Sequence, residues 1–326
     1  MRAWQVTHYG EPTEALALVD VPVPVPGPSQ VLVKVLAAGI NFFDILLCRG
    51  TYQQKPELPF TLGGEVCGEV VAVGSDVSWP NVGERIVAMS ALPTGAFAQY
   101  SVVNAINAFP APEQLSNESA AAFHVSYLTS WFGLHRRAGL RSGETLLVHA
   151  AVGGVGSAAV ELGKAAGAQV IGVVGGPEKA KIAKQLGTDA VIDRTKEDVV
   201  KSVLDLTQGR GADVIYDPVG GQAYRQSVRC IAFEGRIVVV GFAGGEIQTA
   251  AVSHALVKNY SIMGLHFGLY VSRDQALVRA ADEELRLMVA RGQINPLVSE
   301  VATFDALPVA LEKLAKGETY GRIVLR

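Results

Sequence analysis

A glycine-rich segment between residues 149 and 156 carries the clearest chemical signal in the chain. It reads His149-Ala-Ala-Val-Gly-Gly-Val-Gly156, follows a short apolar run at 146–148, and leads into an alanine-rich stretch with helical spacing. Its glycines let the backbone approach a ligand closely, and the helix that follows presents free N–H groups and a positive dipole end. This combination favours a pyrophosphate, so the segment predicts a dinucleotide site. Ala151 stands where the motif G-x-G-x-x-G has its first glycine, and an ordinary tight turn is the alternative interpretation.

The end of the next apolar run indicates which dinucleotide binds. An NAD site usually places an acid about 20 residues beyond the glycines, where it binds the ribose 2′-hydroxyl. Val174 stands at that position here, so nothing repels a 2′-phosphate. Lys179 and Arg194 could bind one as cations, with Gly175 lining the site. The alternative is that both are solvated surface cations, and Glu178 would offset part of their field. We predict NADP(H).

Alternating elements must position these residues. After residue 144, near-continuous apolar runs alternate with helical segments, a pattern typical of a parallel sheet covered by helices on both faces. The runs lie at 146–148, 170–174, 190–192, 214–216 and 237–240. Before residue 113 the chain has short β-branched runs instead, at 31–35, 66–73 and 85–89, separated by Pro and Gly.

The last part of the chain changes pattern again. A helix is expected around 282–291 and another over 305–316, followed by a strand at 323–325. In the second helix Leu307, Leu311 and Leu314 share one face, and Asp305 can cap the start.

Composition excludes several classes of protein. The 326 residues exceed what one core usually supports, which favours two domains. With 49% apolar and 18% charged residues and a net charge of −3, the chain is typical of a soluble enzyme and has no basic footprint for nucleic acid. Its three cysteines are widely spaced, which predicts no disulfide framework and a reducing compartment. We expect a cytoplasmic protein with no membrane segment.

Taken in order, several segments make the whole chain resemble the medium-chain dehydrogenase/reductases, specifically their zinc-free quinone oxidoreductase (zeta-crystallin-like) branch. The matching segments include Ala37-Ala-Gly-Ile-Asn41-Phe-Phe-Asp44 and ranges 63–65, 68–74, 149–156, 211–221, 235–241, 254–259 and 264–268. The resemblance implies an α/β protein with two domains. A GroES-like β-rich catalytic domain would comprise residues 1–123 and 265–326, and a doubly wound Rossmann domain, residues 124–264, would bind NADP(H). It also implies a cleft between the domains and a homodimer or homotetramer.

The zinc-dependent alcohol dehydrogenases of the same superfamily differ at the metal site. They have a cysteine where this chain has Asn41 and a histidine where it has Gly64. Asparagine is a poor zinc ligand and glycine offers no side chain, so we predict no metal site. Only a short connection, 90–95, lies where those enzymes carry a four-cysteine zinc lobe. Glu65 is interpreted as structural.

The resemblance implies three catalytic residues. Asn41 would lie near the nicotinamide and the acceptor, and Asp44 would orient it or a water. Tyr52 matches a tyrosine of the family's substrate cleft, where it would donate to the developing oxyanion or pack against a flat ring. Structural alternatives remain for each: Asn41 as a turn residue, Asp44 as a helix cap, and Tyr52 as a half-buried aromatic.

The resemblance also implies contacts to the cofactor. Thr129 would approach the nicotinamide, Phe242 and Ala243 would offer backbone contacts, and His266 and Phe267 would line the cleft. The predicted cofactor-binding set is completed by Asn41, Ala151, Gly153, Gly154, Val155, Gly156, Gly175, Lys179 and Arg194. His149, inside a strand, is expected to be a packed core residue, and the three cysteines small buried hydrophobes.

Chemistry without a metal or an acid/base pair suits an acceptor that needs little activation. The preferred function is hydride transfer from NADPH to a quinone or activated enone, for which the protein supplies proximity and a few hydrogen bonds. Two alternatives stay open. One is reduction of the double bond of an enoyl thioester or alkenal, and the other is a crystallin-like cofactor-binding protein with little turnover.

Overall fold

The computed structural model describes residues 1–326, which form two compact units. Unit 1 comprises Met1–Val125, Asp282–Ala290 and Asn295–Arg326, and unit 2 comprises Ser126–Ala281 and Arg291–Ile294. The predicted α/β class is confirmed. The domain limits at 123/124 and 264/265 stay a prediction.

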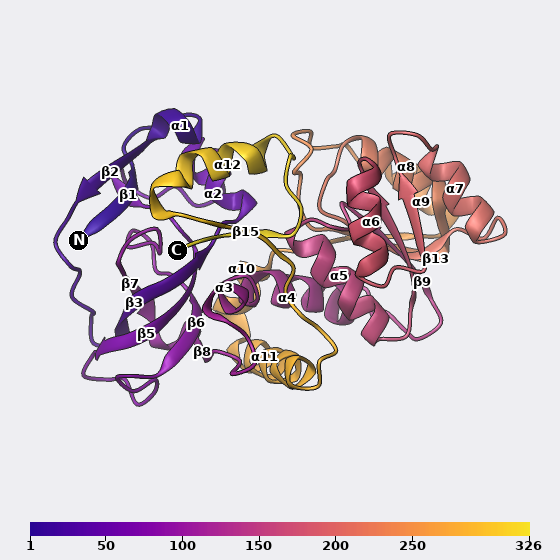
Figure 1. Cartoon of the computed structure of the whole chain (residues 1–326). Helices are drawn as coiled ribbons and strands as arrows, with labels where there is room; N and C mark the ends of the chain where they lie inside the picture. Colours follow the sequence, from indigo (N-terminus) through magenta and orange to yellow (C-terminus); the bar gives the residue numbers. More distant parts are fainter. The chain divides into compact units, whose positions relative to one another are not determined.

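Unit 2 is built on a six-stranded parallel sheet in the order β11-β10-β9-β12-β13-β14. Figure 1 shows β9 and β13 of this sheet together with helices α5 to α9. Its strands are β9 (Thr145–His149), β10 (Gln169–Val174), β11 (Ala190–Asp193), β12 (Ala212–Asp217), β13 (Ile231–Val239) and β14 (Ser261–Gly264). Five of them overlap the predicted apolar runs. The edge strand β14 was missed because it is short and mostly exposed, and so carries no apolar run.

Helices cover both faces of this sheet. The helices packed on its strands are α5 (Gly154–Ala165), α6 (Pro177–Gln185), α7 (Val199–Leu206) and α8 (Gln222–Cys230). Unit 2 also contains α9 (Val252–Lys258) and α10 (Phe267–Arg273). Leu146 and Val170 face α5, where a Cβ on Gly163 would meet Leu146 at 2.5 Å. The alternate side chains, such as Leu147 and Ile171, pack in a buried cluster with residues of α7 and α8. This alternation is what strands buried on both faces require.

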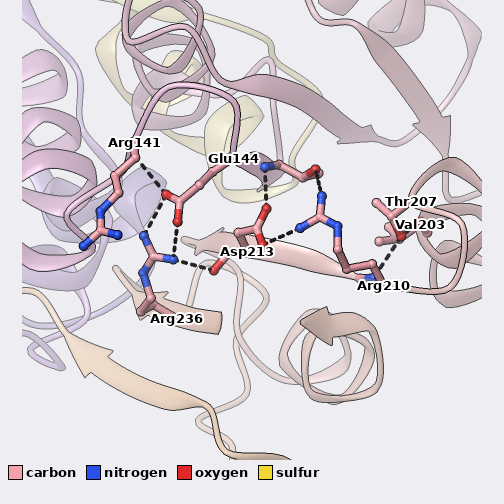
Figure 2. A network of polar contacts seen from close by, with 9 residues as sticks. Arg141, Glu144, Val203, Thr207, Arg210, Asp213 and Arg236 are labelled. Atoms are coloured by element: carbon pink, nitrogen blue, oxygen red, sulfur yellow. Dashed lines mark hydrogen bonds and ion pairs between the residues drawn. The ribbon is translucent and has the colours of Figure 1, made fainter. Parts of the chain in front are cut away.

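A charged network links the amino ends of β9 and β12 to Arg236 in β13 (Figure 2). Arg236 donates to both carboxylate oxygens of Glu144, at 2.8 Å each. Asp213 accepts from the backbone N–H of Thr145 at 2.7 Å and from the guanidinium of Arg210 at 2.5 Å. The side chains of Arg236 and Glu144 are only 15% and 21% exposed, so solvent screens this pair less than a surface pair.

We expect Arg236→Met to lower the free energy of unfolding by about 1–3 kcal/mol. Burial raises the pKa of Glu144, but the hydrogen bond from Arg236, the Arg141 N–H and the Arg236 charge lower it overall. A depressed carboxyl pKa contributes stability that is present above the unfolded pKa and is lost as the pH falls through the folded pKa. The difference between wild type and variant in urea unfolding should therefore shrink below about pH 4.

The matched control for this variant is Arg225→Met. Arg225 pairs with Glu246, and both side chains are about half exposed, so its loss should cost clearly less than the loss of Arg236. Equal losses for both variants, or a difference independent of pH, would contradict the buried-pair account.

Unit 1 is β-rich. A seven-stranded sheet has the order β15-β16-β3-β5-β6-β8, with β7 also paired to β3, and a three-stranded sheet has the order β2-β1-β4. The strands are β1 (Arg2–Val6), β2 (Leu16–Asp20), β3 (Gln30–Gly39), β4 (Phe60–Thr61), β5 (Glu65–Val73), β6 (Arg85–Met89), β7 (Tyr100–Asn104), β8 (Ala108–Pro110), β15 (Val298–Ala302) and β16 (Arg322–Leu325). The helices wholly within unit 1 are α1 (Pro12–Ala15), α2 (Phe42–Cys48), α3 (Asn117–Ala121) and α12 (Leu307–Ala315).

Near the end of the chain the structure corrects two expectations. The helix expected at 282–291 is α11 (Gln275–Ala290), which begins seven residues earlier. Asp305 does not cap α12: the cap position is Ala306, without a side-chain hydrogen bond, and Asp305 pairs with Arg2 instead. Arg2 and Asp305 are about 300 positions apart in the chain, so a local sequence pattern could not indicate that they pair.

Candidate cofactor and active site

The predicted cofactor residues of unit 2 follow the carboxyl ends of its strands. Registers pair His149 with Val173, and Val174 with Asp193, so the ends of β9, β10 and β11 lie level. The ends of β12, β13 and β14 are likewise in register. The segments after these strands therefore share one edge of the sheet, which is where open parallel sheets bind ligands. This edge carries 151–156, 175–179, Arg194, 242–243 and 266–267.

The glycine turn forms the start of α5 as expected. Gly153 is the N-cap and offers no side-chain hydrogen bond, so no oxygen of its own occupies the first-turn N–H groups. A Cβ on Gly156 would lie 2.1 Å from the Ala150 carbonyl oxygen, so only glycine lets the helix begin this close to the turn. Ala151 is fully buried behind it. The residues fit a bound pyrophosphate.

Thr129 lies on α4 (His124–Trp131), and its neighbour Ser130 links this helix to the turn. The Ser130 hydroxyl donates to the Val155 carbonyl at 2.9 Å and lies 3.0 Å from the Tyr216 hydroxyl. His149 is buried, as expected, with Nε2 2.9 Å from Ser227 Oγ. Burial lowers the pKa of His149, which keeps the ring neutral beneath the turn.

Arg194 lies beside Gly175, and Lys179 follows four residues later on α6. A Cβ on Gly175 would lie 3.0 Å from Arg194 Nη2 and 3.3 Å from its Cζ, so the guanidinium lies against this glycine. Burial lowers the pKa of Lys179, and the charge of Arg194 lowers it further. Val174, at the usual acid position, is 2% exposed. The set fits a phosphate monoester better than a ribose hydroxyl.

The remaining predicted contacts lie after β13 and β14. Phe242 is 36% exposed, and the Ala243 N–H donates to the Pro218 carbonyl at 3.1 Å. His266 is the exposed N-cap of α10, whereas Phe267 is 6% exposed and packs 5.6 Å from the Phe132 ring. Phe267 is therefore a packed residue of unit 2, whereas His266 is exposed.

In unit 1, Asn41 is held by a buried cluster. Its Nδ2 donates to the Gly39 carbonyl at 3.2 Å and to Glu65 Oε2 at 3.0 Å, and its Oδ1 accepts from Arg322 at 2.6 Å. Arg322 also donates to Glu65 Oε2 at 2.5 Å. The other Glu65 oxygen accepts from the Val125 N–H at 2.8 Å. The amide of Asn41 is thus largely engaged within the protein.

Asp44 and Tyr52 lie next to this cluster. Asp44 Oδ2 accepts from the Asn41 N–H at 2.7 Å and completes a capping box for α2, while its Oδ1 is buried without a hydrogen bond. Burial raises the pKa of Asp44 to about 7, against the Asn41 hydrogen bond and the Arg322 charge. Burial, and then the Asp44 charge, also raise the pKa of Tyr52. The Tyr52 ring lies 5.8 Å from that of Phe43, tilted by 32°.

The residues at this position do not fit a zinc ion. A Cβ on Gly64 would meet the Phe43 ring at 2.3 Å, so the place of a histidine ligand is filled by an aromatic ring. Arg322 already supplies the positive charge opposite Glu65. No cluster of three or more His, Cys, Asp or Glu side chains is arranged to hold a metal anywhere in the chain. We derive no step through a metal.

Sequence reasoning missed two residues of these sites. Arg322 reaches Asn41 across 281 positions of the chain, so no local pattern could have indicated it. Asp193, which binds the Gly176 N–H at 2.8 Å, carried a weak signal as the acid that ends the third strand before Arg194.

Two protein families match the chain. An alcohol dehydrogenase GroES-like domain matches residues 27–113, and a family described as zinc-binding dehydrogenase matches 154–283. No helix of the structure is long and apolar enough to span a bilayer.

Individual relatives cover nearly the whole chain. A quinone oxidoreductase-like protein 2 homolog of Nematostella vectensis is 39% identical over 301 residues, covering 92% of this chain and 82% of that protein. The crystal structure of Escherichia coli quinone oxidoreductase complexed with NADPH has a TM-score of 0.93 at 30% identity, covering 100% of this chain and 99% of that one. A reducing polyketide synthase of Cochliobolus heterostrophus is 33% identical over 299 residues, which make up 90% of this chain but only 12% of that protein.

Proposed function

The chain belongs to the medium-chain dehydrogenase/reductase superfamily, in its quinone oxidoreductase-like branch, and from this premise we propose that it is an NADPH-dependent, zinc-independent reductase of quinones or activated enones. The observation that carries the proposal is the Arg194 guanidinium against Gly175, with Lys179 four residues further on in α6, at a sheet edge where Val174 replaces the acid of an NAD site. The E. coli relative with NADPH bound supports the same cofactor.

Each predicted residue has a task in this proposal. The first turn of α5, from Gly153 to Gly156, would bind the pyrophosphate with backbone N–H groups. Gly175, Lys179 and Arg194 would bind the 2′-phosphate. Thr129, Phe242, Ala243, His266 and Phe267 would line the nicotinamide end. When bound, NADPH supplies a hydride to the acceptor.

The catalytic proposal rests on the cluster around Asn41. Because its amide is engaged, Asn41 would act as a fixed residue rather than a mobile donor. Tyr52 and Phe43 are neighbouring, partly buried rings, against which a planar acceptor would stack. The Tyr52 hydroxyl, kept protonated by its raised pKa, would donate to the oxyanion that forms on the reduced acceptor. Asp44 would hold the N-cap of α2 and so the position of Asn41.

We expect Tyr52→Phe to lower kcat/KM for the acceptor by roughly 10²-fold, because the oxyanion loses a donor. The KM for NADPH should not change. The matched control is Tyr320→Phe in unit 1, at an exposed position, which should leave the kinetics unchanged. Steady-state kinetics at fixed NADPH measures this. If both variants retain wild-type kcat/KM, Tyr52 only packs.

A second candidate activity is reduction of the double bond of an enoyl thioester or an alkenal. The observation that favours it is the match to a segment of a reducing polyketide synthase. One assay separates the functions: NADPH oxidation is followed with a planar ortho-quinone, an alkenal and a crotonyl thioester. Fastest turnover with the ortho-quinone supports the proposal, and fastest turnover with the thioester supports the second activity. NADPH binding without turnover would favour a crystallin-like role.

The proposed assembly is a homodimer or homotetramer formed through unit 2. Val252, Leu256 and Val257 of α9 are 77–78% exposed, and the following strand β14 is the edge strand of the sheet, with Ile262 exposed. An exposed apolar helix beside a free strand edge is a surface that a second copy can cover. Sedimentation of wild type and of Leu256→Glu tests this, since only the variant should be monomeric.

A further inference from the structure

Asp193 joins the two loops that carry the proposed 2′-phosphate site. It ends β11 and is the register partner of Val174 at the end of β10. Its Oδ1 accepts three hydrogen bonds: from the Gly176 N–H at 2.8 Å, the Thr195 N–H at 3.1 Å and the Thr195 hydroxyl at 2.7 Å. One oxygen therefore fixes both the turn before α6 and the loop after β11.

Both loops need such a restraint. Gly176 has φ +101°, a conformation that only glycine adopts easily and that one hydrogen bond helps to select. Arg194 lies between Asp193 and Thr195, and its N–H donates to the Val174 carbonyl at 2.9 Å. The guanidinium then lies against Gly175. Without the hydrogen bond from Gly176 to Asp193, the Gly175–Gly176 turn would be less restrained. This turn leads into α6, which carries Lys179, and it lies against Arg194.

An acid beside a phosphate site would ordinarily oppose it. Here Asp193 as a whole residue is only 7% exposed, and its Oδ1 accepts from N–H and O–H donors of the protein. The Thr195 hydroxyl and the Gly176 N–H lower the pKa of Asp193, so it stays ionised as an acceptor. Its own N–H donates to Glu197 at 2.9 Å, which ties the loop further.

We propose that Asp193 is the positioning residue that sets 2′-phosphate specificity. It does so by holding the Gly175–Gly176 turn and Arg194 in positions where both can contact the same phosphate. This inference rests on the proposed NADPH function. Asp193 itself would not touch the ligand. Its loss should therefore weaken ligands that carry a 2′-phosphate and spare those that lack it.

The experiment compares adenosine 2′,5′-bisphosphate with 5′-AMP by titration calorimetry on the full chain. Asp193→Ala should weaken binding of the bisphosphate about tenfold and leave the affinity for 5′-AMP unchanged. Asp193→Asn keeps a side-chain acceptor and should recover part of the loss. Asp198→Ala, which removes the N-cap of α7 in the same region, is the matched control and should change neither affinity.

The outcomes are distinguishable. If wild type binds both ligands equally, the NADPH proposal fails and this inference fails with it. If wild type prefers the bisphosphate but Asp193→Ala keeps the same preference, only the inference fails. Tighter bisphosphate binding by Asp193→Asn would show that the carboxylate opposes the phosphate, which also overturns it. If Asp193→Ala does not fold, Thr195→Val removes one of the same hydrogen bonds and should show a smaller loss of the same sign.

Discussion

Replacing Arg322 with methionine should lower the free energy of unfolding by about 3–5 kcal/mol, a large fraction of the stability of a typical domain. The Arg322 side chain is 6% exposed and that of Glu65 is fully buried. Removing the guanidinium leaves the Glu65 carboxylate without its cation and Asn41 Oδ1 without its donor. A Cβ on Gly39 would lie 2.7 Å from Arg322 Nη2, so the site is shaped around this group and a methionine fills it poorly. Urea unfolding measures the loss.

Two control variants separate the loss of the buried ion pair from the loss of a cation alone. Arg326→Met removes a cation whose side chain is 72% exposed and should cost at most ~1 kcal/mol. The double variant Glu65→Gln with Arg322→Met removes both charges, and it should regain part of the loss because no unpaired charge stays buried. A loss below ~1 kcal/mol for Arg322→Met would contradict the buried ion pair as a main support of unit 1.

The second large effect concerns the cofactor. The double variant Lys179→Ala, Arg194→Ala should raise the Kd for NADPH by about 10²-fold or more, because each charge-assisted hydrogen bond to a phosphate contributes about 1.5–3 kcal/mol. The Kd for NADH, which lacks the 2′-phosphate, should change little. Fluorescence titration of the reduced nicotinamide measures both constants on the same preparations.

Lys181→Ala is the matched control for this variant. Lys181 lies two residues beyond Lys179 on the same helix and is exposed, so its removal should leave both affinities nearly unchanged. Equal weakening of NADPH and NADH by the double variant would mean that the cations stabilise the sheet edge rather than bind the 2′-phosphate.

Much of the fold could be predicted because it depends on local patterns. Apolar runs buried on both faces mark five of the six strands of unit 2, and the strand at Arg85–Met89 was predicted to the residue. The glycine turn and the position of Val174 relative to it are also local, so the dinucleotide edge could be described before the structure. By contrast, β14 is an exposed edge strand with no apolar run to mark it.

What escaped prediction depends on contacts between distant parts of the chain. Arg322 lies next to Asn41 only because β16 pairs with β3. Asp305 pairs with Arg2 instead of capping the last helix. The sequence could place Asn41 at a non-metal position, but not show that its amide is already engaged by Gly39, Glu65 and Arg322. The same holds for Asp193, whose three hydrogen bonds appear only when β10 and β11 lie in register.

The most direct test of the central proposal is the ratio of kcat/KM for NADPH to that for NADH, measured with a planar ortho-quinone in the presence of a strong chelator. We predict a ratio well above ten, with full activity retained in chelator, because the 2′-phosphate meets two cations and no step requires a metal. A ratio near one, or activity that disappears with the chelator and returns with zinc, would contradict the account of a metal-independent NADPH reductase.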